Sequence, residues 1–307
     1  MIDWKLALST ATRLSKPSPD VSAHEVAEAV AELREGAARS EQPVRAFSNL
    51  HARSATAPVL IVDRPRWIEA NLETFRVLMD PVVAKLVAAD KVPTGLGKVV
   101  GEKVGGAELG ALMSFMSSKV LGQFDPFWVG PNGEAGRLLL VAPNIVQVER
   151  QLGVDPHDFR LWVCLHEETH RVQFTAVPWL SGHMRSLLDE FIEATDLDSS
   201  ALSKMLGDSL GEAVKIIRGE SEASLSELFQ NPRQREIVDQ LTGIMSLLEG
   251  HADVVMDGVG PDVIPTVAEI RRKFNERRKG AGGLDRLVRR LLGLDAKMRQ
   301  YRDGAEF

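Results

Sequence analysis

The chain has 307 residues with an ordinary globular composition, 44% hydrophobic and 26% charged, and a net charge of -6. Its single cysteine, Cys164, excludes an internal disulfide and therefore a disulfide-stapled secreted domain. We expect Cys164 to be a small core residue, with a thiolate ligand as the minority alternative.

The N-terminus argues against export, since Asp3 and Lys5 stand where a signal peptide needs an apolar run. The most apolar long stretch, 104–124, is interrupted by Glu108 and Lys119 and therefore predicts a buried helix, not a membrane span. We accordingly predict a cytoplasmic protein without a membrane partner.

Helical periodicity dominates the chain, which predicts a mainly α fold with a small β-sheet or hairpin. A short strand is expected at 58–62, ending at Asp63, which could cap the next helix. Asp155 is expected to cap a later helix in the same way. The other expected elements are helices at about 3–15, 22–38, 144–152, 156–175, 183–204, 209–218, 232–257, 266–279 and 284–302, and a hairpin at 124–143.

Glycines recur at four-residue spacing, first at Gly97, Gly101 and Gly105 and then at Gly106 and Gly110. Glycines on one helix face let a second backbone approach closely, so we predict tight helix packing here. A phosphate-binding loop would need Ser or Thr at position 99, and the sequence has valine there.

The segment with the clearest chemistry is His166-Glu-Glu-Thr-His170. Two histidines four residues apart lie one turn above each other on a helix, so both imidazoles can bind one ion. Glu167 points about 100° around that helix, where it can activate a metal-bound water without being a ligand. The alternative is a surface helix with merely polar histidines, but the flanking Trp162, Leu165 and Val172 favour burial.

A catalytic zinc site needs a third protein ligand and leaves a fourth position for water. A metzincin would have glycine at position 173 and histidine at 176, where this sequence has Gln173 and Ala176. We prefer Glu249 to Glu190 as the third ligand. The full set of downstream candidates comprises His183, Asp189, Glu190, Glu193, Glu249 and His251.

The preference for Glu249 rests on the run Leu-Glu-Gly-His-Ala-Asp at 248–253. Asp253 lies one helical turn beyond Glu249, where it could accept a hydrogen bond from a ligand histidine. Gly250 would let the two helices approach closely. His251 lies about 200° from Glu249 around the helix, so it is expected to be an ordinary histidine or a substrate contact, not a ligand.

These two segments, together with 291–301 and the hairpin region, resemble a family of zinc-dependent metalloproteases found mainly in actinobacteria and often associated by name with deazaflavin coenzyme biosynthesis. The resemblance implies a zincin-like, gluzincin-type fold, with one zinc ion held by His166, His170 and Glu249. It implies a single domain over 1–307, with a helical lobe over about 1–121 and a catalytic lobe over about 122–307. One departure is the charged Glu168, where zincins generally have an uncharged residue.

Two functions follow as expectations. In the first, the protein is a zinc metallopeptidase that hydrolyses an unidentified peptide or protein, with Glu167 as general base and the strand 137–141 offering a free edge to the substrate. His183, His251 and Tyr301 are possible contacts to the substrate or the transition state. In the second, the protein is a catalytically silent, zinc-stabilised scaffold.

A basic segment at 271–302 has twelve Lys or Arg and three acidic residues. We expect it to lie on a solvated helix face or to dock on the acidic body. Nucleic-acid binding is not expected, because no recognised motif accompanies the charge and aromatic residues are sparse there.

Overall fold

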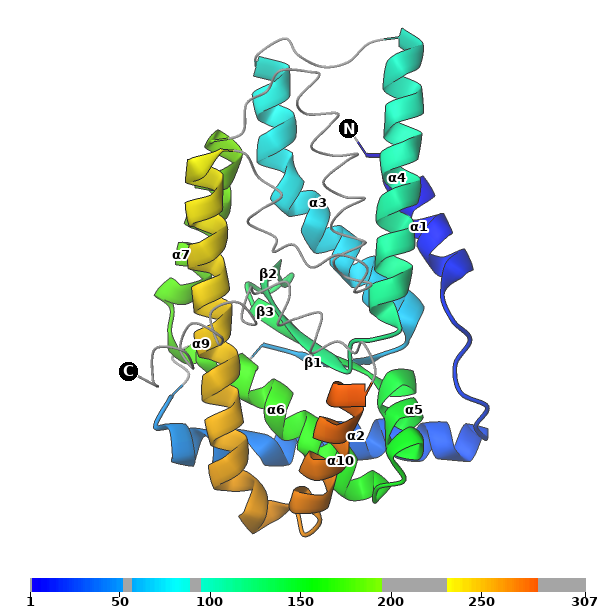
Figure 1. The fold of residues 1–307 in the computed structure, drawn as a ribbon, viewed down its shortest axis with the longest axis vertical. Helices are drawn as coiled ribbons and strands as arrows, with labels where there is room; N and C mark the ends of the chain where they lie inside the picture. The colour runs from blue at the N-terminus through cyan, green and yellow to red at the C-terminus, as the bar shows by residue number, and fades with distance from the viewer. Residues whose placement is uncertain (1, 52–56, 89–94, 195–230, 281–307) are drawn as a thin grey trace.

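The structure is a computed structural model that describes residues 2–51, 57–88, 95–194 and 231–280 (Figure 1). Its helices are α1 (Trp4–Leu14), α2 (Ala23–Ser48), α3 (Arg64–Ala88), α4 (Gly95–Ser117), α5 (Ala142–Leu152), α6 (Pro156–Ala176), α7 (Trp179–Glu193), α9 (Pro232–Val263) and α10 (Val267–Gly280). Its strands are β1 (Val59–Val62), β2 (Gly122–Val129) and β3 (Ala135–Val141). The predicted class, mainly helical with a small sheet, is confirmed.

The sheet has the order β1-β3-β2, with β3 parallel to β1 and antiparallel to β2. Our expectation that 137–141 offers a free edge is therefore wrong, since β3 is the central strand. The reason is the parallel pairing with β1, a contact between segments far apart in the sequence that local periodicity cannot reveal. The unbroken apolar run from Leu138 to Val141 fits a strand covered on both faces.

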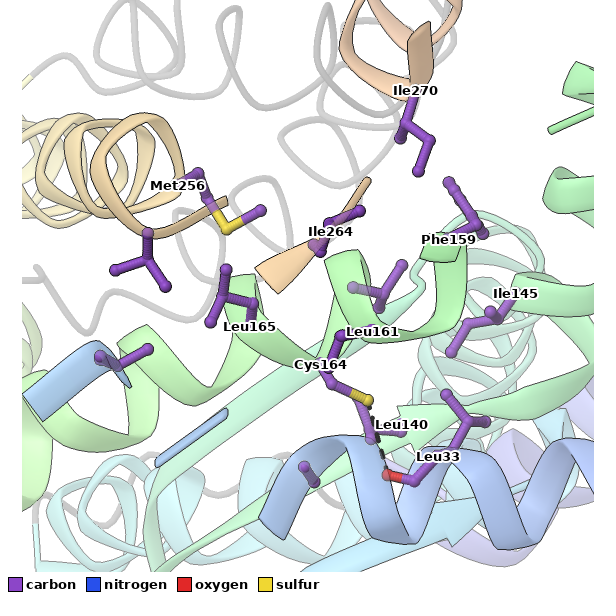
Figure 2. Packing of buried hydrophobic residues seen from close by; sticks show 14 of the residues in the cluster. Leu33, Leu140, Ile145, Phe159, Leu161, Cys164, Leu165, Met256, Ile264 and Ile270 are labelled. Carbon is purple, nitrogen blue, oxygen red and sulfur yellow. Dashed lines mark hydrogen bonds between the residues drawn. The ribbon is translucent and has the colours of Figure 1, made fainter. Parts of the chain in front are cut away.

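Alternate residues of β3 enter different hydrophobic clusters, as the period of a strand requires. Leu139 and Val141 pack with side chains of α1, α3 and α4. Leu140 belongs to the largest cluster, which α2, α5, α6, α9 and α10 form together (Figure 2). The sheet thus lies between two helical layers, and α6 is a central element of the larger core. The division into an N-terminal and a catalytic lobe remains a prediction.

Cys164 lies in this larger core, as predicted (Figure 2). Its thiol donates to the carbonyl oxygen of Leu33 at 3.5 Å, and burial raises its pKa, which disfavours a thiolate. The thiol of Cys164 therefore contributes packing between α6 and α2.

The glycine-rich stretch forms α4, which packs against α1 (Figure 1). A β-carbon on Gly106 would lie 2.6 Å from the carbonyl oxygen of Asp3, and one on Gly110 would lie 2.6 Å from that of Ala7. Close helix packing is thus confirmed for these two glycines. It is wrong for Gly101 and Gly105, where an added β-carbon would meet nothing within 4 Å.

The helix caps predicted at Asp63 and Asp155 are confirmed. The Asp63 side chain accepts from the backbone N–H of Arg66 at 2.8 Å, and Asp155 accepts from that of Asp158 at 2.9 Å. Helix α2 differs from its prediction, because it continues beyond residue 38 to Ser48 and includes Pro43. Its extra turns bury Ser40 and Val44, so tertiary packing extends the helix past a residue that normally ends one.

Several expectations fall outside the described residues, namely the helices at 209–218 and 284–302, the end of 183–204, most of the basic segment, and Tyr301. Within the described ranges, none of the helices combines the length and the apolar character that crossing a bilayer requires.

Candidate metal centre

Helix α6 carries the histidine motif below the sheet in the view of Figure 1, in contact with α2 and α9. Its first turn is anchored by Asp158, which accepts from the backbone N–H and the hydroxyl of Thr266 at 2.9 and 2.6 Å. Because Thr266 lies between α9 and α10, this contact fixes the end of α9 against the start of α6.

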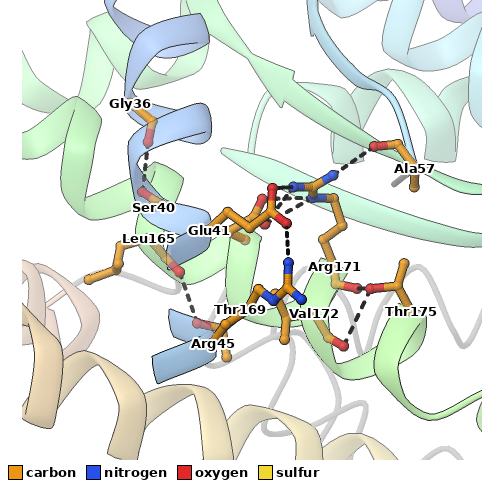
Figure 3. A network of polar contacts seen from close by, with 11 residues as sticks. Gly36, Ser40, Glu41, Arg45, Ala57, Leu165, Thr169, Arg171, Val172 and Thr175 are labelled. Atoms are coloured by element: carbon orange, nitrogen blue, oxygen red, sulfur yellow. Dashed lines mark hydrogen bonds and ion pairs between the residues drawn. The ribbon is translucent and has the colours of Figure 1, made fainter. Parts of the chain in front are cut away.

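A second anchor lies inside the motif itself. Glu168 is fully buried and accepts from the guanidinium of Arg171 at 2.7 to 3.0 Å. Arg171 also reaches Glu41 of α2 and the carbonyl oxygen of Ala57, each at 3.0 Å (Figure 3). The charged residue that departs from the usual zincin pattern therefore belongs to a buried network that ties α6 to α2 and to the segment before β1.

On the face toward α9, α6 presents His166 and His170, whose Nε2 atoms are 3.3 Å apart. Glu249 of α9 faces both, with carboxylate oxygens 3.8 Å from Nε2 of His166 and 3.5 Å from Nε2 of His170. One ligand atom from each of the three residues lies within 4.8 Å of the others. Among the described residues, these three side chains form the cluster that could hold a metal ion.

The distances fit zinc. Zinc binds histidine nitrogen at about 2.0–2.1 Å in tetrahedral sites, which puts two such nitrogens about 3.3 Å apart. The observed separation of 3.3 Å between the histidine nitrogens equals that value, and the nearest carboxylate contact of 3.5 Å is close to it. All three side chains are partly exposed, so the centre leaves room for a water molecule or a substrate group.

The whole sequence points to the same class of protein. The family model of zincin-like metallopeptidases matches residues 2–307. The chain belongs to the zincin-like metallopeptidase family. The chain is also similar to a crystal structure from Chloroflexus aurantiacus, which is described as a candidate hydrolase with a novel fold. The two sequences are 27% identical, the TM-score is 0.65, and the match covers 96% of this chain and 82% of that chain. None of the curated proteins is similar enough in sequence to count as a relative.

In this member of the zincin-like family, Glu167 is buried next to the candidate metal ligands, with only 7% of its surface exposed. Its carboxyl group lies against Gly122, where a β-carbon would come within 2.5 Å of Glu167 Cγ and Cδ. Burial, with a smaller contribution from the negative charge of Glu249, raises the pKa of Glu167 to about 8. A divalent cation bound nearby would oppose this shift, because it stabilises the ionised carboxylate.

The competing ligand Glu190 is not part of the centre. It lies on α7 and forms an ion pair with Arg233 at the start of α9. His183, also on α7, contacts the ring of Trp179 with centroids 6.1 Å apart. Asp189 lies 3.5 Å from Arg185 in an intrahelical pair. None of these three side chains belongs to the cluster that the described residues form around His166.

The roles expected for Asp253 and Gly250 are not reflected in the geometry. The Asp253 carboxylate is largely exposed and lies 3.4 Å from Arg271, so its described partner is on α10 and not on a ligand histidine. A β-carbon at Gly250 would meet nothing within 4 Å, so the expected close approach of two helices at that glycine is wrong. The apolar face of α9, and not Gly250, governs its packing on α6.

His251 is separate from the ligands, as its position on the helix predicted. Its Nδ1 lies 2.8 Å from the amide nitrogen of Gln173, and burial, with the nearby His170, lowers its pKa. Sequence reasoning missed Gln173, which served only to exclude the metzincin pattern. Its spacing three residues after His170 was the available signal, because such residues share a helix face.

A cavity of about 660 Å³ lies away from these side chains, between α2, β1, α5 and the start of α6. The three candidate ligands and Glu167 are absent from its described lining. The candidate metal centre is therefore separate from this cavity and rests on the chemistry of its side chains.

Proposed function

We propose that this chain is a zinc-dependent peptidase in which His166, His170 and Glu249 hold one zinc ion and Glu167 is the general base. The observation that carries the proposal is the meeting of two histidines from α6 with a carboxylate from α9 at distances that suit zinc. The buried Glu167 beside them supplies the acid–base group that peptide hydrolysis requires.

Zinc bound at this centre would polarise a peptide carbonyl and acidify the attacking water. Glu167 would take the proton from that water and later deliver it to the leaving amine. Its position supports this role, because the next residue after a ligand histidine points away from the ligand face yet remains within one side-chain length of it. Gly122 leaves the space that the carboxyl group of Glu167 occupies, because a β-carbon there would come within 2.5 Å of Glu167 Cδ.

The substrate we propose is an extended peptide bound along β2. Strand β2 is an edge strand of the described sheet, unlike β3. It begins at Gly122, directly beside Glu167, so a peptide added to its edge would pass the general base. Strand addition would supply main-chain hydrogen bonds without demanding a particular sequence.

The experiment is cleavage of a panel of denatured proteins and peptides by wild-type protein and by Glu167→Gln. We expect wild-type cleavage that chelator abolishes and zinc restores, and a Glu167→Gln variant that binds zinc stoichiometrically but cleaves at least about 100-fold more slowly. A variant that keeps its activity, or that loses zinc together with activity, would contradict the role assigned to Glu167.

The alternative of a catalytically silent scaffold drew on the charged Glu168 within the motif. The salt bridge to Arg171 accounts for that charge as a buried structural contact. The same panel separates the two functions, because stoichiometric zinc without any cleavage would favour the scaffold.

A further inference from the structure

Gln173 is a buried amide at the junction of the two helices that carry the candidate ligands. Only 3% of its surface is exposed, and its side chain makes three polar contacts. The amide nitrogen donates to the carbonyl oxygen of Leu248 at 2.9 Å and lies 2.8 Å from Nδ1 of His251. The amide oxygen lies 3.0 Å from Nδ1 of His170.

These contacts determine which way the amide faces. The carbonyl oxygen of Leu248 can only accept a hydrogen bond, so the amide nitrogen of Gln173 must be the group that faces it. The opposite orientation would bring two oxygens together and leave a buried carbonyl facing an acceptor. The amide oxygen therefore faces His170.

The orientation of the amide in turn determines the tautomer of His170. An amide oxygen cannot donate, so Nδ1 of His170 must carry the proton that forms the 3.0 Å contact. In the neutral ring, Nε2 then keeps its lone pair and points at His166 and Glu249. This is the tautomer that a metal ligand needs.

The second N–H of the amide has the opposite effect on His251. It points at Nδ1 of His251, which must accept and therefore carries no proton. The neutral ring of His251 is then protonated at Nε2, which becomes a hydrogen-bond donor on the helix that carries Glu249.

The bond to Leu248 adds a positional constraint. Leu248 directly precedes Glu249 on α9, so a hydrogen bond from α6 to its backbone fixes the height of Glu249 relative to His170. The hydrogen bond holds α9 at Leu248, next to Glu249. A shift of α9 at this point would separate the Glu249 carboxylate from both imidazoles.

We propose that Gln173 is a positioning residue that holds His170 as the Nδ1–H tautomer, holds His251 as the Nε2–H tautomer, and fixes α9 against α6 beside Glu249. The metal-binding consequence rests on the proposed function, but the two tautomers do not depend on turnover. Asp253 was expected from the sequence to orient a histidine, and Gln173 takes that role here.

The test combines side-chain nitrogen NMR of the histidines with zinc competition against a chelator. Spectra of the wild-type protein are recorded with zinc and after its removal, and the signals are assigned with His170→Asn and His251→Asn. We expect zinc-free protein at neutral pH to show His170 protonated at Nδ1 and His251 protonated at Nε2. Either histidine in the other tautomer would overturn the proposal.

Two variants separate the contacts. Gln173→Glu keeps the acceptor toward His170, so the tautomer of His170 should stay as in wild type. As a carboxylate it cannot donate to Leu248 or His251, so the contact with Leu248 is lost and His251 should no longer be held as the Nε2–H tautomer. Gln173→Met removes all three contacts and should weaken zinc binding by about 10- to 100-fold. Gln147→Met is the control: it removes one of the two side-chain acceptors that α5 offers to Arg64, and it should leave zinc affinity unchanged.

Zinc affinity of Gln173→Met within twofold of wild type, in a folded protein, would overturn the proposal. If that variant does not fold, the tautomers in wild type and in Gln173→Glu still decide the question. If the protein cleaves no substrate, the proposed function is contradicted but the role of Gln173 is not, since neither the spectra nor the zinc affinity depends on catalysis.

Discussion

The carboxyl group of Glu167 packs against the α-carbon of Gly122, so that a β-carbon at position 122 would come within 2.5 Å of Glu167 Cδ. This contact joins the first residue of the edge strand β2 to the residue that follows the first ligand histidine. It places the proposed general base and the proposed peptide-binding edge next to each other.

Gly122→Ala tests that contact. The added methyl group must displace the Glu167 carboxyl, whereas the atoms that it would meet do not include those of the proposed ligands His166, His170 and Glu249. We expect kcat/KM on a cleaved peptide to fall about 100-fold, the cost of misplacing a catalytic group by about an ångström, with zinc content unchanged. Gly182→Ala is the control, because a β-carbon there meets nothing within 4 Å. If Gly122→Ala and Gly182→Ala are equally active, the contact between Gly122 and Glu167 does not matter for cleavage.

The buried network around Glu168 predicts a large loss of stability on truncation. Glu168→Ala leaves Arg171 without its closest carboxylate in the interior, which should lower the free energy of unfolding by about 3–5 kcal/mol. The exposed pair Arg66–Glu69 provides the comparison, and Glu69→Ala should cost less than about 1 kcal/mol. Urea unfolding measures both, and similar losses would contradict the structural role of Glu168.

Because α1 packs on only part of α4, alanine substitution at two glycines of α4 should change the stability of the protein in opposite directions. Gly110→Ala would bring a β-carbon within 2.6 Å of the Ala7 carbonyl oxygen and should destabilise the protein by about 1–3 kcal/mol. Gly101→Ala meets open space and should stabilise it by up to about 1 kcal/mol, because alanine favours helix. Thermal unfolding of the pair checks the sign of each change.

The helix cap at the start of α2 predicts a dependence on pH. Hydrogen bonds from the backbone and side chain of Ser22 lower the pKa of Glu25, and Arg150 contributes. A carboxyl group with a lowered folded-state pKa stabilises the fold above its unfolded pKa of about 4.3 and loses that effect as pH falls. Glu25→Gln should therefore melt at a lower temperature than wild type at pH 7, and the difference between the two melting temperatures should shrink as pH falls through the lowered pKa of Glu25.

The features predicted correctly from the sequence are those that depend on local spacing. Two histidines four residues apart on a helix must share a face, and Asp63 and Asp155 cap helices through bonds spanning three residues. The structure brings Glu249 and not Glu190 near the histidines, although the hydrogen-bonding role of Asp253 that supported the choice is absent from the described contacts. The role of Glu249 as a metal ligand stays a prediction.

The features missed depend on contacts between distant segments. The parallel pairing of Val59 with Leu138 makes β3 central, and no local pattern in either strand specifies its neighbour. The role of Gln173 likewise requires knowing which backbone carbonyl of α9 faces α6. Glu168 looked anomalous because its ion pair with Arg171, three residues on, was not recognised, and because Glu41, which also pairs with Arg171, lies on the distant helix α2.

Metal analysis of three proteins tests the central claim most directly. Wild type and Glu190→Ala should each bind one equivalent of zinc after dialysis, because Glu190 pairs with Arg233 away from the centre. Glu249→Ala should lose the metal, since its carboxylate faces both histidine nitrogens. Retention of a full equivalent of zinc by Glu249→Ala, or loss of zinc by Glu190→Ala, would contradict the metal centre described above.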